Sequence, residues 1–235
     1  MRFIFVLLFV LFVAPIVLSQ PETFGFESFI PNNSKVVLTV SGDLNKDAFV
    51  DLAVVIEETD SGKIKPNTGF GPDTLNLNPR TLLVLFGNNK GKYWLAAKND
   101  LGFIPAENVE DLPCLADPLL TDGGITIKNN VLNIELNYWT SCGSWFEGRM
   151  KYAFRYQNEA FELIGFDKSS MHRASGATSV TSINFSTKKK QVTTGGNVFE
   201  ATQNHPKTKT VQIKFGVLMK LKDCNPDMLE LLDDL

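Results

Sequence analysis

The chain has 235 residues, of which 43% are hydrophobic, and a formal net charge of −3 at pH 7. A chain of this length buries enough apolar surface to form one large or two small folded domains. The mildly acidic balance, with no dominant basic stripe, excludes nucleic acid as the main partner.

The first 19 residues have the layout of a cleavable export signal. Arg2 is the only charged residue before Glu22, the run from Phe3 to Leu18 is almost entirely apolar, and the small residue Ser19 precedes the expected cut. A short basic region, an apolar region and a small-residue cleavage site are typical of secretory signals. The apolar run is shorter than the ~20 residues that span a bilayer. We therefore expect residues 1–19 to be removed, and the mature chain to be periplasmic or extracellular without stable membrane insertion.

Short runs of β-branched, aliphatic and aromatic residues recur along the rest of the chain and predict strands. They lie at residues 35–40, 52–56, 81–86, 93–97, 125–128, 131–138, 150–156, 161–166, 179–186, 191–194 and 210–221. Turn-forming residues such as Asn129-Asn130 separate many of these runs, and this close spacing favours antiparallel hairpins over β-α-β units. Residues 58–80 have no periodicity and predict a long loop, whereas 106–112 and 226–232 predict short helices.

The predicted fold class is therefore all-β, built mostly of antiparallel hairpins in a meander, with short helices at the junction and at the C-terminus. We divide the chain into the signal at 1–19, a β region at 20–110 and a second antiparallel β region at 111–235. The second region can form one continuous domain with the first.

Residues 43–51 form the one motif whose side chains specify a chemistry. Asp43, Asn45, Asp47 and Asp51 occupy positions 1, 3, 5 and 9 of a short loop, and the backbone carbonyl of Phe49 falls at position 7. Calcium takes about six to eight oxygen ligands, and alternate residues of a tight loop converge on one point. Three carboxylates this close repel each other without a cation. These features predict a calcium site, although an acidic β-turn held by its own hydrogen bonds explains the same residues.

The segment Ser41–Asp47, continuing through Asp51–Val54, resembles the calcium loop of FG-GAP (or VCBS) repeats, the units of integrin-α-type propellers. Residues 83–88 resemble the strand and turn that close such a repeat. The resemblance covers residues 35–100 and implies that the calcium ligands are the five residues named above. The C-terminal part is similar to exported bacterial proteins that carry such a loop upstream.

Two departures from the FG-GAP pattern limit what the resemblance implies. Ala48 stands where the family has glycine, and a left-handed backbone there costs roughly 1–2 kcal/mol, which predicts weak calcium binding. The sequence also holds a single copy of the motif, whereas a propeller repeats its unit at a fixed period. We therefore expect a local calcium-binding loop in another β architecture and not a full propeller.

Three cysteines remain in the mature chain, at Cys114, Cys142 and Cys224. Export makes a disulfide possible, and the pair Cys114–Cys142 is preferred because it closes a modest loop. The other pairings stay open, and an odd count leaves one thiol over. Cys142 and His172 could in principle act as nucleophile and base, but nothing in the local sequence supports that role.

Aromatic residues are frequent in the C-terminal part, at Tyr138-Trp139, at Trp145-Phe146 and between Tyr152 and Phe166. Alternation along strands favours a place in the core for these rings. Exposed on one face, they would instead stack on a sugar or a peptide.

The sequence carries no motif of a hydrolase elbow, a zinc protease or a phosphate-binding loop. We therefore expect a non-enzymatic exported β protein that acts in binding or surface architecture, with at most one structural calcium and a protein or glycan ligand. The alternative is a secreted or periplasmic hydrolase whose site is assembled from distant residues.

Overall fold

The computed structural model describes residues 22–200, 205–227 and 232. The expected export signal at 1–19 lies outside these residues, as do positions 228–231 of the expected C-terminal helix. Pro226, Asp227 and Leu232 of that helix are helical.

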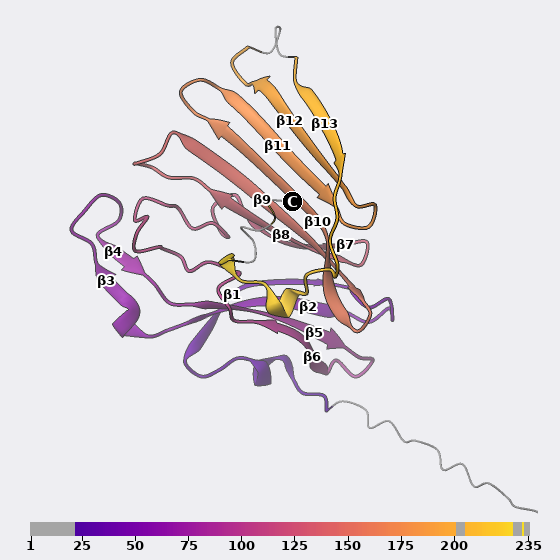
Figure 1. The fold of residues 1–235 in the computed structure, drawn as a ribbon. Helices are drawn as coiled ribbons and strands as arrows, with labels where there is room; N and C mark the ends of the chain where they lie inside the picture. The colour runs from indigo at the N-terminus through magenta and orange to yellow at the C-terminus, as the bar shows by residue number, and fades with distance from the viewer. Residues whose placement is uncertain (1–21, 201–204, 228–231, 233–235) are drawn as a thin grey trace, which may run out of the picture.

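Two antiparallel sheets share one core and form most of the fold (Figure 1), and a small two-stranded sheet is added to them. The smaller sheet has four strands in the order β1-β2-β5-β6. Their bounds are Ser34–Gly42 for β1, Asp51–Glu58 for β2, Arg80–Gly87 for β5 and Tyr93–Asn99 for β6. The two central strands, β2 and β5, are buried along most of their length. One face of this sheet meets the larger sheet, and the 3-10 turn η1 at Phe26–Phe29 covers the other.

The larger sheet has seven strands in the order β13-β12-β11-β10-β9-β8-β7, so that each strand pairs with its neighbour in sequence. Their bounds are Gly124–Lys128 for β7, Val131–Tyr138 for β8, Phe146–Gln157 for β9, Ala160–His172 for β10, Ala177–Asn184 for β11, Lys189–Asn197 for β12 and Lys207–Gln212 for β13. In Figure 1 the sheet rises as a fan from the smaller sheet toward β12 and β13.

The alternation of apolar and polar side chains along β8 explains why one face of this strand packs against the smaller sheet. Leu132, Ile134 and Leu136 are fully buried against the smaller sheet, while the intervening residues are partly exposed. An alternation of period two places all three on one face of the sheet. The core formed in this way includes residues of both predicted β regions, among them Val55 of β2 and Phe166 of β10.

The all-β, antiparallel fold class predicted from the sequence is confirmed, and three local predictions are wrong. Residues 106–112 form no helix but an irregular segment with an isolated bridge between Val109 and Leu112. The predicted loop at 58–80 contains the 3-10 turn η2 (Ser61–Lys63) and a small hairpin of β3 (Ile64–Pro66) and β4 (Thr74–Asn76). The last strand ends at Gln212, and residues 213–221 cross back toward the smaller sheet.

A third 3-10 turn, η3 at Leu221–Asp223, contacts β6 and β10. Within residues 22–200, 205–227 and 232, no helix is long and apolar enough to cross a membrane.

Candidate functional site

The calcium-type loop at 43–51 connects β1 to β2 at one end of the smaller sheet. Leu44 anchors it in the core at 1% exposure. The amide side chain of Asn130, in the β7–β8 turn, donates to the carbonyl of Asp43 at 2.7 Å. The loop is therefore fixed to both sheets.

The side chains of the loop are bonded to its own backbone. The carboxylate of Asp43 accepts from the N–H groups of Lys46 (2.6 Å) and Ala48 (3.2 Å). Asp47 accepts from the N–H of Phe49 (2.8 Å) and from the side-chain amide of Asn45 (2.8 Å). Ala48 has a φ of 67°, so the residue at the usual glycine position adopts the left-handed conformation.

Asp51 is fully buried beneath the loop. Its two oxygens accept from the backbone N–H of Leu44 at 2.7 Å and of Gly87 at 3.0 Å. Burial raises the pKa of Asp51, with a further contribution from the charge of Asp47, and the two N–H donors oppose the rise. Asp51 thus joins the loop to the end of β5.

No group of three or more acidic, histidine or cysteine side chains in the described part of the chain is arranged to hold a metal ion. Asp43, Asn45 and Asp47 lie together in the loop, and Asp51 turns its carboxylate inward. Each carboxylate oxygen that accepts one of these N–H groups keeps a further lone pair. The carboxylates of Asp43, Asp47 and Asp51 are thus held by hydrogen bonds within the loop and to Gly87.

The preferred disulfide, Cys114–Cys142, forms in the structure, with the two Cα atoms 5.5 Å apart. It ties the segment before β7 to the connection between β8 and β9. Cys142 is therefore no thiol nucleophile, and the Cys142/His172 pair is excluded. Cys224 is the free cysteine, and burial raises its pKa to about 12.

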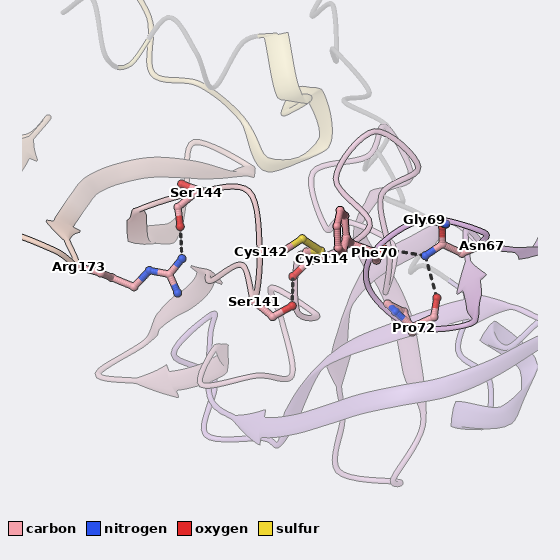
Figure 2. Close-up of a disulfide and its surroundings, with 9 residues drawn as sticks. All are labelled: Asn67, Gly69, Phe70, Pro72, Cys114, Ser141, Cys142, Ser144 and Arg173. Atoms are coloured by element: carbon pink, nitrogen blue, oxygen red, sulfur yellow. Dashed lines mark hydrogen bonds between the residues drawn. A yellow bond between two sulfur atoms is a disulfide. The ribbon is translucent and has the colours of Figure 1, made fainter.

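An open cleft of about 580 Å³ lies beside the disulfide. Two aromatic side chains, several polar groups and the disulfide itself line it: Phe70, Gly71, Pro72, Glu107, Asn108, Pro113, Cys114, Leu115, Ala116, Asp117, Thr121, Trp139, Ser141 and Cys142. Figure 2 shows the ring of Phe70 next to the disulfide.

Phe70 is 81% exposed, yet the loop that carries it is firmly held. The side-chain amide of Asn67 donates to the carbonyls of Phe70 (2.8 Å) and Pro72 (2.9 Å), as Figure 2 shows. Gly71 has a φ of 100° and approaches Pro113 so closely that a Cβ would lie 2.5 Å from its carbonyl oxygen. An exposed ring on a fixed backbone loses little conformational entropy when it binds a ligand.

Trp139 forms the other aromatic side of the cleft. Its ring lies 5.8 Å from the guanidinium carbon of Arg173, a cation–π arrangement. Arg173 also donates through its guanidinium to the carbonyl of Ser144 and through its backbone N–H to the carbonyl of Trp145 at 2.7 Å. Arg173 thus connects the Trp139 ring to the backbone at Ser144 and Trp145.

A buried ionic network supports the floor of the cleft. Arg80 binds the carboxylate of Asp117 through two hydrogen bonds of 2.8 and 2.6 Å and that of Glu57 at 2.8 Å. Lys35 and Asn76 also donate to Glu57. Burial alone would raise the pKa of Glu57, but the hydrogen bonds from Lys35, Asn76 and Arg80 and the charge of Arg80 lower it.

Some of the aromatic residues of the C-terminal part lie in the core, and others are exposed. Tyr152 and Phe166 are buried in the core, whereas Trp139, Trp145 and Phe146 are 38%, 65% and 60% exposed. Sequence reasoning missed Phe70, which follows Gly69 in a segment without periodicity. A single aromatic residue among turn formers is a weak signal that could have marked it.

Comparison of the chain with protein-family models, with curated proteins and with solved structures found no match.

Proposed function

We propose that the protein is an exported, non-enzymatic binding protein whose cleft beside the Cys114–Cys142 disulfide takes a glycan. The exposed ring of Phe70, on a loop held by hydrogen bonds, carries this proposal together with Trp139, which lines the same cleft. A sugar ring presents polarised C–H groups on its faces and hydroxyls at its edges. The C–H groups fit the electron-rich faces of aromatic rings, and the hydroxyls fit the polar groups between them.

The polar residues that line the cleft support ligand binding in preference to catalysis. Asp117 has both carboxylate oxygens on Arg80, and Glu107 accepts from the amide of Asn76 at 2.8 Å. His172 lies outside the cleft lining, beside Ser175 and the ring of Phe146. Carboxylates fixed in this way act as hydrogen-bond acceptors for hydroxyls, as ligand pockets with a few placed polar groups do.

We propose a separate, structural role for the 43–51 loop. By its resemblance to FG-GAP loops, it takes one calcium ion through Asp43, Asn45, Asp47, Asp51 and the carbonyl of Phe49. The left-handed backbone at Ala48 supports this proposal, because the same position is glycine in the family. The ion would neutralise the loop's carboxylates, and it takes no part in the cleft.

An array of immobilised neutral and acidic glycans, probed with the mature chain, tests the proposal. We expect selective binding to a subset of glycans, which Phe70→Ala removes. Phe24→Ala is the matched control, because Phe24 is an exposed phenylalanine that pairs with the edge strand β6. Absence of selective binding, or equal binding by both variants, would refute a glycan site in this cleft.

A further inference from the structure

The larger sheet ends in a strand whose outer edge is open. β13 pairs with β12 and stands at the border of the fan in Figure 1. In the described part of the chain, no other strand or loop forms a backbone hydrogen bond with the opposite edge of β13. An open edge presents N–H and C=O groups with which another extended chain can pair.

The register shows which residues of β13 turn their backbone groups outward. Ile213, directly after the strand, donates its N–H to the carbonyl of Lys188 at 2.9 Å. Hydrogen-bonded and non-hydrogen-bonded pairs alternate along an antiparallel ladder, and the register between β12 and β13 is unbroken. The N–H and C=O groups of Thr208 and Thr210 therefore point away from β12, to the open edge. The contact of 2.8 Å between the hydroxyls of Thr193 and Thr208 agrees, because side chains approach most closely at non-hydrogen-bonded pairs.

The side chains on one face of this edge are basic. Lys207 and Lys209 alternate with Thr208 and Thr210 along the strand, so the two lysines share a face. Both lysines, together with Val192 of β12, line a groove of about 450 Å³. Neither lysine forms an ion pair within residues 22–200, 205–227 and 232. The edge therefore offers two ammonium groups at a spacing of two residues.

This part of the chain carries a local excess of positive charge. β11, β12 and β13 contain four lysines and no aspartate or glutamate, and no acidic residue lies between Asp167 and Glu200. The whole chain has a net charge of −3, so its acidic residues are concentrated elsewhere. An extended partner with carboxylates at alternate positions matches both the spacing and the sign of the two lysines.

A second copy of this chain fits the edge poorly. Antiparallel pairing of two β13 strands would place lysines of both copies on one face, opposite or diagonal to each other. Like charges in such positions destabilise a sheet pair, and lysines at sheet edges counteract self-association. The same side chains favour a strand of opposite charge.

We propose that β13 binds an extended acidic segment of a partner protein as an additional antiparallel strand of the larger sheet. The backbone groups of Thr208 and Thr210 form the hydrogen bonds, and Lys207 and Lys209 attract carboxylates two residues apart. Toward the partner the lysines occupy non-hydrogen-bonded positions, where cross-strand side chains approach most closely. No residue of β11, β12 or β13 lines the aromatic cleft, so this surface does not depend on glycan binding there.

Fluorescence anisotropy of the mature chain with a labelled, capped heptapeptide of alternating threonine and glutamate tests the proposal. We expect saturable binding that weakens severalfold from low to high salt, and no binding of the corresponding threonine–lysine peptide. The double variant Lys207→Glu, Lys209→Glu should reverse this preference. Lys90→Glu, Lys92→Glu is the matched control, because it makes the same charge change in the exposed turn between β5 and β6. Absence of wild-type binding, or equal effects of the two double variants, would overturn the proposal.

Backbone N-methylation of the peptide separates strand addition from attraction to charge alone. When the glutamates face Lys207 and Lys209, the N–H groups of the peptide's threonines point to β13. N-methylation of the threonines should weaken binding by about tenfold or more, because at least two hydrogen bonds are lost. N-methylation of the glutamates should leave binding unchanged. Equal binding by the two methylated peptides would show that only charge is recognised and would contradict the inference.

A variant of the edge tests the same point from the side of the protein. Thr210→Pro removes an outward N–H without removing a hydrogen bond to β12, and proline is tolerated at such positions of edge strands. The variant should keep the melting temperature of the wild type and bind the acidic peptide more weakly. Thr210→Ala, which keeps the N–H, should bind like the wild type. Wild-type affinity in Thr210→Pro would place the peptide elsewhere.

Discussion

Asp51 and Glu57 are buried carboxylates on the same strand whose pKa values shift in opposite directions. Asp51 accepts from neutral backbone N–H groups, which do not offset the loss of water. Glu57 accepts from Lys35, Asn76 and Arg80, whose combined effect exceeds that of burial. Each positively charged partner favours the ionised form, and a neutral amide does so less.

Replacement of Glu57 by glutamine should lower stability by about 2–3 kcal/mol at neutral pH, since it removes charged hydrogen bonds to a buried arginine. The folded-state pKa of Glu57 lies below its ordinary value of 4.5. Its contribution is therefore complete above that pH and is lost as the pH falls through the folded value. Denaturant unfolding of both proteins at decreasing pH measures this, and we expect their difference to shrink in acid. A difference independent of pH would show that Glu57 is not ionised in the network.

Millimolar calcium should raise the melting temperature of the wild-type protein, and a chelator should reverse the shift. A ligand that binds only the folded loop stabilises it by RT ln(1 + [L]/Kd), about 2.7 kcal/mol at a hundredfold excess over Kd. Asp47→Ala should abolish the response. If neither calorimetry nor melting detects calcium in the wild type, the loop is only a turn.

Ala48→Gly isolates the strain in the same loop. At a φ of 67° alanine carries a steric cost that glycine lacks. We expect the variant to gain about 1 kcal/mol of stability without calcium and to bind calcium more tightly. Unfolding curves with and without the ion separate these two effects. A loss of stability in both conditions would mean that the left-handed conformation is not strained.

At the scale of elements, the disulfide joins two segments that line the cleft, the one before β7 and the one between β8 and β9. Its two cysteines are separated by 28 residues, and a loop of that length corresponds to about 3–4 kcal/mol of stabilisation. The double replacement Cys114→Ser and Cys142→Ser should lower the free energy of unfolding by that amount. Phe70 should then be less firmly placed, because its loop packs on Pro113. Cys224→Ala, which breaks no disulfide, is the control. Unchanged stability of the double variant would show that the bond constrains little.

Elements with a clear apolar alternation could be predicted from the sequence, and others could not. β8 and the turn at Asn129-Asn130 follow from local chemistry, and both asparagines have positive φ. β9 and β10 extend well beyond the predicted runs, and the added part of β10 carries polar residues such as Lys168 and Ser170, which give no apolar alternation to find. The segment 106–112 has helix-compatible spacing, but Pro105 and Pro113 flank it and its side chains pack irregularly.

The candidate sites depend on contacts that no local pattern encodes. The positions of the calcium-type ligands and the disulfide pair could be proposed from spacing. The cleft could not, because Phe70 and Trp139 lie far apart in sequence and line one cleft only once the loop that carries Gly71 packs on Pro113.

At the scale of the whole molecule, the Cys114–Cys142 disulfide agrees with the expected export, because disulfides form and persist outside the reducing cytoplasm. N-terminal sequencing of the mature protein should begin at Gln20 or be blocked by its cyclisation, because the apolar run ends in a small-residue cleavage site. Secretion of a chain that retains residues 3–18 would contradict this. The same material is the proper form for every binding experiment.

The central claim is that a glycan binds between Phe70 and Trp139. Titration of wild-type protein, Phe70→Ala, Trp139→Ala and the double variant with the strongest-binding soluble oligosaccharide from the array tests it most directly. Each single variant should bind about tenfold more weakly. The double variant should depart from additivity, because the two rings contact the same ligand. Wild-type affinity in all three variants would contradict the claim.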